Sequence, residues 1–253
     1  MIATLVLPIL AAASSPAAED TSQRTECLQL AAHDPSAAED AASEWFDQAK
    51  GSNADQAAAQ ECLGTSLANR GEWEDAESAF LHARALAPEE AVVMRARLGA
   101  MAGNAALADG RVADALASLN EAALNAGSAG DAVLAGGIAI DRARALVSSG
   151  DMEGASAALT EARGHNPDDW EAWLFSATLA RRQGDLVAAQ QFIEKAADLR
   201  PVELTVGLEA GVIAALSGHD AAARKSWQSV IDAKPKSHEA EAARAYLAQM
   251  DQP

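Results

Sequence analysis

The sequence predicts an all-helical chain, a solenoid of tandem helix-turn-helix repeats about 34 residues long. Three observations predict this fold class. Apolar residues make up 49% of the 253 residues, but aromatic residues only 4%, and alanine dominates the apolar share. β-branched residues are confined to short runs, and glycines and prolines recur at fixed offsets along the chain. Together these features favour closely packed helices joined by short turns.

The first 18 residues are predicted to be an export signal. Residues 2–13 are apolar, and small residues suited to a cleavage site follow at 14–18. The apolar stretch is too short to span a bilayer comfortably, so we expect no stable membrane span. Because no Lys or Arg precedes it, a first amphipathic helix is the alternative interpretation. We expect a mature chain of residues 19–253 that is periplasmic or secreted, with a cytoplasmic location as the alternative.

Two cysteines, Cys27 and Cys62, are separated by 34 residues, which is almost one repeat length. In an oxidising compartment this pair favours a disulfide. Closing a loop of that size would stabilise the N-terminal end by roughly 3 to 4 kcal/mol in the chain-entropy model. The alternative is two buried free thiols that pack as small apolar residues.

Residues 22–50 are predicted to form an atypical N-terminal repeat. Two helices are expected, over residues 27–33 and 36–49, with Trp45 and Phe46 as the large core residues. Ser36 is followed by Glu39 three residues later, which is the pattern of a capping box. We therefore expect the second helix to begin at Ser36.

Downstream, the same pattern of residues occurs five times. A glycine that ends one helix is found at Gly71, Gly110, Gly150, Gly184 and Gly218. Five residues later comes an alanine that allows close helix packing, namely Ala76, Ala115, Ala155, Ala189 and Ala223. Four residues beyond the alanine stands a large apolar residue, namely Phe80, Leu119, Leu159, Ile193 and Trp227. The glycine is expected in the left-handed conformation, and the large residue on the face that fills the space between units.

These columns resemble those of the tetratricopeptide repeat (TPR) family, of a type exported by bacteria. The resemblance places repeats at 57–90, 96–129, 136–169, 170–203 and 204–237. A final amphipathic helix at 238–250 is expected to cap the last repeat. Extra apolar residues before the second and third repeats predict additional helical turns. The resemblance implies a right-handed superhelix of antiparallel helix pairs, with a concave groove lined by the first helix of each pair.

The sequence contains no pattern that predicts catalysis, a cofactor or a metal site. The five histidines include no pair at helical ligand spacing, and there is no phosphate loop or nucleophile elbow. Acidic residues after turn glycines and prolines, such as Asp151, Asp169 and Asp185, are expected at helix starts. With 37 acidic residues against 19 basic ones, the net charge of -18 argues against nucleic acid as a partner.

What the resemblance implies for binding is a groove that carries several basic and amide side chains. Its expected residues are Asn69, Arg97, Asn104, Arg144, Arg181, Arg182, Leu208 and Val212. One interpretation is that the arginines bind carboxylates of a protein or peptide segment. The other is that they pair internally with acids such as Glu161 and Glu171. The chain is thus predicted to be a non-catalytic scaffold or adaptor, monomeric or weakly self-associating. The alternative is a structural protein that self-associates through its convex face or C-terminal helix.

Overall fold

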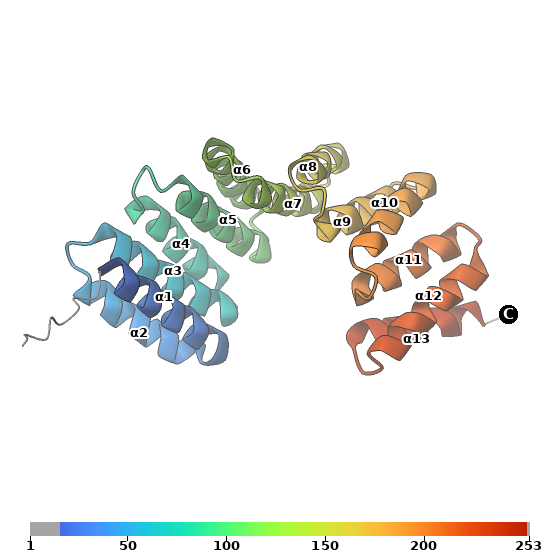
Figure 1. The fold of residues 1–253 in the computed structure, drawn as a ribbon, viewed down its shortest axis with the longest axis horizontal. Coiled ribbons are helices and arrows are strands. Elements are labelled where there is room, and N and C mark those ends of the chain that lie inside the picture. Colours follow the sequence, from blue (N-terminus) through green and yellow to red (C-terminus); the bar gives the residue numbers. More distant parts are fainter. Residues whose placement is uncertain (1–15, 252–253) are drawn as a thin grey trace, which may run out of the picture. The chain divides into compact units, whose positions relative to one another are not determined.

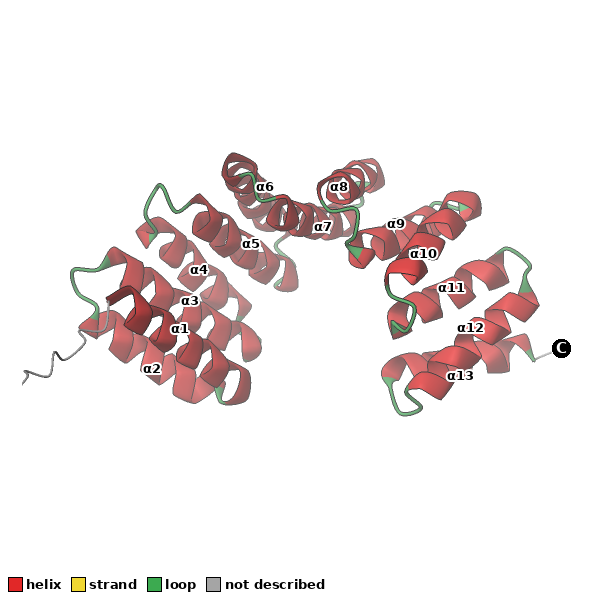
Figure 2. Cartoon of the chain, in the orientation of Figure 1, coloured by secondary structure: helices red, strands yellow, loops and turns green. Residues whose placement is uncertain are grey.

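The computed structural model describes residues 16–251, which are helical apart from short connections (Figure 2). Among these residues there is no strand, so the predicted all-α fold class is confirmed. The chain forms two compact units, of which the first ends at Pro88 and the second begins at Glu89. Residues 1–15, the greater part of the predicted export signal, lie outside the described residues.

The first unit is coloured from blue to teal in Figure 1, and its helices pack in chain order, α2 on α3 and α3 on α4, while α1 lies against both α2 and α3. Its helices are α1 (Pro16–His33), α2 (Pro35–Gln48), α3 (Asn53–Asn69) and α4 (Trp73–Leu86).

The second unit consists of helix pairs that pack on their neighbours in chain order. Its helices are α5 (Val92–Ala108), α6 (Val112–Ala129), α7 (Ala132–Ser149), α8 (Met152–His165), α9 (Trp170–Arg182), α10 (Leu186–Leu199), α11 (Leu204–Leu216), α12 (Asp220–Ala233) and α13 (His238–Met250). As the extra apolar residues predicted, α5 and α7 extend to 17 and 18 residues, whereas α9 and α11 have 13. The last helix, α13, packs on both α11 and α12 and so closes the end of this unit.

Each of the five predicted pairs, from α3–α4 to α11–α12, turns at a glycine in the left-handed conformation, as predicted. At Gly150, φ is +84°, and the following Asp151 donates its backbone N–H to the carbonyl of Leu146 at 2.9 Å. Among the other turn glycines, φ is +84° at Gly184 and lies between +76° and +79° at Gly71, Gly110 and Gly218. A side chain would be strained in this region, so the glycine column fixes where the first helix ends.

The predicted alanine column is fully buried, with an exposed fraction of 0% at all five positions. The large residue that follows fits against a small residue on the first helix of its own pair. A Cβ added to Gly211 would lie 2.1 Å from Nε1 of Trp227, and one added to Gly103 would lie 2.6 Å from Cγ of Leu119. These side chains therefore fill the space within a pair as well as between pairs.

Short acidic side chains begin several helices. The carboxylates of Asp151, Asp169 and Asp185 accept backbone N–H groups of α8, α9 and α10, as predicted. At α2 the prediction is wrong, because the helix begins at Pro35 and Asp34, not Ser36, is its N-cap. Because the fixed φ of proline suits the first helical position, the helix starts at Pro35, one residue closer to the N-terminus than predicted.

Candidate functional site

The first helices of two neighbouring pairs in the second unit, α7 and α9, border a hollow of about 220 Å³. Its apolar lining comes from Ala143, Val147, Leu159, Phe175 and Leu179. Its polar lining comes from Arg144, Thr178 and Arg182. We call this the α7–α9 hollow. Of the predicted groove residues, the structure thus brings Arg144 and Arg182 to a single apolar depression.

The two arginines of this hollow differ in their partners. Arg144 is half-exposed and forms an ion pair with Asp141, one turn earlier on α7, at 3.2 Å. Arg182 is exposed in the last turn of α9, and its side chain forms no ion pair or hydrogen bond within residues 16–251. Arg182 is therefore the cation beside the hollow that is available to a carboxylate of a ligand.

Asp141 links α7 to the preceding first helix. One of its oxygens accepts a hydrogen bond from Nδ2 of Asn104 on α5 at 2.7 Å, and the other accepts from Arg144. Burial raises the pKa of Asp141, while the bonds from Asn104 and Arg144 act in the opposite direction. Burial also raises the pKa of Glu171 on α9, helped by the negative charges of Asp169 and Asp141. The face formed by these helices is consequently of mixed charge, not uniformly basic.

Arg181, unlike the adjacent Arg182, forms an ion pair within the protein. Its guanidinium forms two hydrogen bonds to the carboxylate of Glu209 on α11, at 2.6 and 3.3 Å. Of the two interpretations left open by the sequence, internal pairing therefore holds for Arg144 and Arg181. Their partners are Asp141 and Glu209, whereas Glu161 pairs with Arg142 at 2.8 Å.

The remaining predicted groove residues do not line the hollow. Asn69 lies in the first unit, where its amide donates to the carbonyl of Ala31 at 2.9 Å. Arg97 is partly buried on α5. Leu208 and Val212 are partly buried and pack against the core formed by α11, α12 and α13. Contacts within the protein therefore explain why Leu208 and Val212 are apolar, and no ligand is needed to explain them.

Sequence reasoning missed two residues that define the hollow and its charge, Phe175 and Asp141. Phe175 precedes Thr178 and Arg182 on α9 by three and seven residues, so helical periodicity places all three on one face. That spacing was the available signal for Phe175. Asp141 had none, because its role depends on how α5 and α7 are offset in space.

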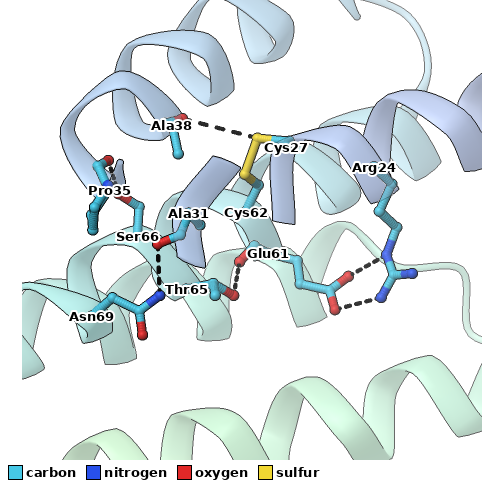
Figure 3. Close-up of a disulfide and its surroundings, with 10 residues drawn as sticks. All are labelled: Arg24, Cys27, Ala31, Pro35, Ala38, Glu61, Cys62, Thr65, Ser66 and Asn69. Carbon is cyan, nitrogen blue, oxygen red and sulfur yellow. Dashed lines mark hydrogen bonds and ion pairs between the residues drawn. A yellow bond between two sulfur atoms is a disulfide. The ribbon is translucent and has the colours of Figure 1, made fainter. Parts of the chain in front are cut away.

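The two cysteines are joined by a disulfide between α1 and α3, with their Cα atoms 6.0 Å apart (Figure 3). An ion pair lies beside it, in which Arg24 of α1 donates two hydrogen bonds to the buried carboxylate of Glu61, at 2.7 and 2.8 Å. On the other side, Asn69 of α3 bonds to the carbonyl of Ala31 (Figure 3). The first helix is thus attached to the third at three points over about two turns of its length.

Within residues 16–251 there is no group of three or more side chains that could hold a metal ion. No helix in this range is sufficiently long and apolar to cross a bilayer. The carboxylate of Asp141, close to the α7–α9 hollow, accepts hydrogen bonds from Asn104 and Arg144. The arrangement offers an apolar depression next to a cation, which suits binding of an apolar group that carries or neighbours a negative charge.

Comparison with known proteins finds a family model that resembles part of the chain. A tetratricopeptide repeat family model matches residues 140–203, which include α8, α9 and α10 and most of α7. No curated protein matches the chain.

Several solved structures share the fold. They include PilW, described as a widely conserved type IV pilus biogenesis factor, with a TM-score of 0.71 and 16% identity over 90% of this chain and 99% of that one. The structure of pilF from Pseudomonas aeruginosa has a TM-score of 0.67 and 16% identity, with the same coverage. YrrB, described as a TPR protein with an unusual peptide-binding site, has a TM-score of 0.54 and 20% identity over 79% of this chain and 97% of that one. At these identities the likeness concerns the fold alone.

Proposed function

We propose that the chain is a non-catalytic scaffold that holds a segment of a partner protein on the face formed by α7 and α9. The observation that carries this proposal is the α7–α9 hollow with Arg182 beside it. A large apolar side chain of the partner fits the depression between Val147, Phe175 and Leu179. A carboxylate close to that side chain then reaches Arg182, whose charge is not neutralised by a neighbour.

The fold supports a binding role of this kind. Stacked helix pairs present long faces to partners, and helical segments or extended peptides bind such faces through a few anchoring side chains. Two of the similar structures point the same way, since YrrB is described as having a peptide-binding site and PilW as a biogenesis factor. We extend to this chain the role of an adaptor or assembly factor.

We further propose that this scaffold works in the periplasm or the cell envelope. Two features support the location, the signal-like residues 1–18 and the cysteine pair, which is stable as a disulfide in an oxidising compartment. Fractionation of cells followed by mass measurement of the mature chain tests it. A protein that starts within or just after residues 14–18 and lacks free thiols supports export, whereas an intact N-terminus in the cytoplasm refutes it.

Variants of the hollow test the binding face. Arg182→Glu reverses the available charge, and Thr178→Met fills the depression with a flexible apolar side chain. Arg200→Glu is the matched control, because Arg200 is exposed after α10 and does not line the hollow. Capture from envelope extract by the wild-type chain, with identification by mass spectrometry, supplies the partner.

The proposal expects that this partner is retained by Arg200→Glu and lost by both hollow variants, with the helical content unchanged. Arg181 is left intact, since reversing its charge would disrupt the pair with Glu209 and confuse folding with binding. Equal capture by all variants would show that the partner binds elsewhere.

A further inference from the structure

Arg163 of α8 occupies an unusual environment on another side of α9. Its guanidinium carbon lies 5.3 Å from the ring centre of Trp173 and 4.6 Å from that of Phe192, on α9 and α10. The guanidinium also donates to the hydroxyl groups of Ser176 and of Thr160, the latter at 3.1 Å. Two rings and two hydroxyl groups therefore hold this side chain in one place.

The surroundings are themselves fixed. The indole of Trp173 donates to the carbonyl of Pro167 at 2.8 Å, and the buried hydroxyl of Ser176 donates to the carbonyl of Ala172 at 2.6 Å. Because that proton is already used, the oxygen of Ser176 can only accept from Arg163. The guanidinium is held in place before any ligand arrives, which lowers the entropic cost of binding one.

No carboxylate neutralises Arg163 within residues 16–251. Arg24, Arg142 and Arg181 each meet a glutamate, but Arg163 forms no ion pair with a described residue. Burial alone lowers the pKa of its guanidinium, which marks the cost of holding this charge away from water. The aromatic rings offset part of that cost, and the remaining charge can be matched by an anion.

Arg163 opens onto a hollow of about 200 Å³ between α8, α9 and α10, which we call the α8–α10 hollow. Leu159 and Leu179 line it, and they line the α7–α9 hollow as well, so the two hollows are separated by these leucines. Ser156, Gln183 and Asp185 provide its polar lining. The single charge of Arg163 and the apolar floor suit one carboxylate, whereas the negative charge of Asp185 disfavours a dianion such as phosphate.

We propose that the α8–α10 hollow is a second ligand site, which takes one carboxylate attached to an apolar group through the guanidinium of Arg163. The carboxylate accepts from guanidinium N–H groups that the two hydroxyl groups do not use, and the apolar group lies on Leu159, Leu179 and Phe192. The source of the carboxylate is either a free organic acid or an acidic side chain of a protein. This site does not depend on binding in the α7–α9 hollow.

Titrations followed by nuclear magnetic resonance of the full mature chain test this proposal. The reporters are the Nε–H signal of Arg163 and the indole N–H signal of Trp173. The probes are phenylacetate, its neutral analogue phenylacetamide, inorganic phosphate, and the blocked peptide acetyl-Leu-Glu-Leu-amide, each up to about 10 mM, which is sufficient for weak ligands of millimolar affinity. The variants are Arg163→Met, Ser156→Met, which narrows the hollow without replacing Arg163, and the control Arg200→Met, at an exposed residue that lines neither hollow.

We expect saturable shifts with phenylacetate or the peptide and none of comparable size with phenylacetamide or phosphate. Arg163→Met should weaken binding at least about tenfold, because it removes charge-assisted hydrogen bonds, while Arg200→Met should leave it unchanged. Ser156→Met should weaken binding as well and keeps the test valid if Arg163→Met does not fold. Tighter binding of phenylacetate identifies a free acid as the source, and tighter binding of the peptide identifies a protein side chain.

Three results would overturn the proposal. They are the absence of a saturable shift with either carboxylate probe, binding that survives both Arg163→Met and Ser156→Met, and equal binding of phenylacetamide or phosphate. None of them bears on partner capture through Arg182, so the two proposals fail separately.

Discussion

The beginning of the first unit and the middle of the second hold one helix against the next in different ways. In the first unit, α1 is attached to α3 by a disulfide, by the buried pair of Arg24 and Glu61, and by the amide of Asn69 (Figure 3). In the second unit, α8 and α9 meet around Leu159 and Leu179, with a hollow on each side of these leucines.

This difference indicates where function can reside. The disulfide, the ion pair and the amide hydrogen bond make the junction of α1 and α3 difficult to open. Such attachment is useful in a terminal helix of a stack, because an open end would expose the core. Incomplete packing at the junction of α8 and α9 leaves room for the side chain of another molecule, at the cost of lost contacts between the helices. We therefore expect the first region to contribute more to stability, and the second is where binding is proposed.

Removal of the disulfide is the strongest way to weaken the first region. The Cys27→Ala/Cys62→Ala variant should lose about 3 to 4 kcal/mol of stability, because its unfolded state regains the freedom of the closed loop. Urea unfolding measures the loss, and hydrogen exchange should place it in α1, α2 and α3. Dithiothreitol should reproduce the effect in the wild-type chain and do nothing to the variant. Equal unfolding midpoints for variant and wild type would show that the disulfide does not stabilise this unit.

Glycine substitutions compare tight and loose packing within the second unit. Gly211→Ala should destabilise the protein by roughly 1 to 3 kcal/mol, since the new methyl group meets the buried indole of Trp227. Gly137→Ala is the control, because a Cβ there would have no neighbour within 4 Å. It should stabilise α7 by about 0.5 to 1 kcal/mol through better helix propensity. Thermal unfolding separates the two, and similar effects of both would contradict the packing at Gly211.

Much of the fold could be predicted because its determinants are local. The glycine that ends a helix, the aspartate that begins one and the alanine that allows close packing each act within a few residues. A mistake arose at α2, where Ser36 with Glu39 and Asp34 with Pro35 both match known helix starts. Glu39 instead forms an ion pair with Arg70, the residue that follows α3, and the local sequence does not reveal this partner.

The site was predictable only in part, because charge pairing depends on distances between separate helices. Position within a repeat predicted Arg144 and Arg182 on one groove face, and both line the α7–α9 hollow. It could not distinguish the exposed Arg182 from Arg181 next to it, whose partner Glu209 lies 28 residues away on α11. The cluster of Arg163, Trp173 and Phe192 likewise has no signature in the sequence, since it is assembled from three helices.

The ion pair of Arg24 with the buried Glu61 in the first unit should contribute more than an exposed one. Arg24→Gln leaves the carboxylate of Glu61 with weaker compensation and should cost roughly 1 to 2 kcal/mol. In the control, Arg224→Gln breaks the ion pair with Asp251. The side chain of Arg224 is 42% exposed and that of Asp251 is 65% exposed. The cost of Arg224→Gln should stay below about 0.5 kcal/mol, because water and salt screen such pairs. Urea unfolding in low and high salt tests the contrast, and equal costs for both variants would contradict it.

The smallest expected effect is the pH dependence of stability that comes from Asp141, on the face that carries the α7–α9 hollow. Because burial raises the pKa of Asp141, the folded protein keeps a proton there at pH values where the unfolded chain has lost it. This contribution to stability is present below the ordinary pKa of 3.8 and is lost as pH rises through the raised value. Asp141→Asn cannot lose a proton, so its stability relative to wild type should increase over that interval.

Glu239 serves as a control, because its pKa is lowered by folding whereas that of Asp141 is raised. Hydrogen bonds from a backbone N–H at the start of α13 and from Ser237 lower its pKa, so its contribution is present above the ordinary value of 4.5 and is lost as pH falls. Glu239→Gln should therefore lose stability relative to wild type as pH rises. Unfolding curves at a series of pH values give both differences. A flat difference for Asp141→Asn would mean that water reaches this carboxylate, and that the face between α5 and α7 is more open than its packing indicates.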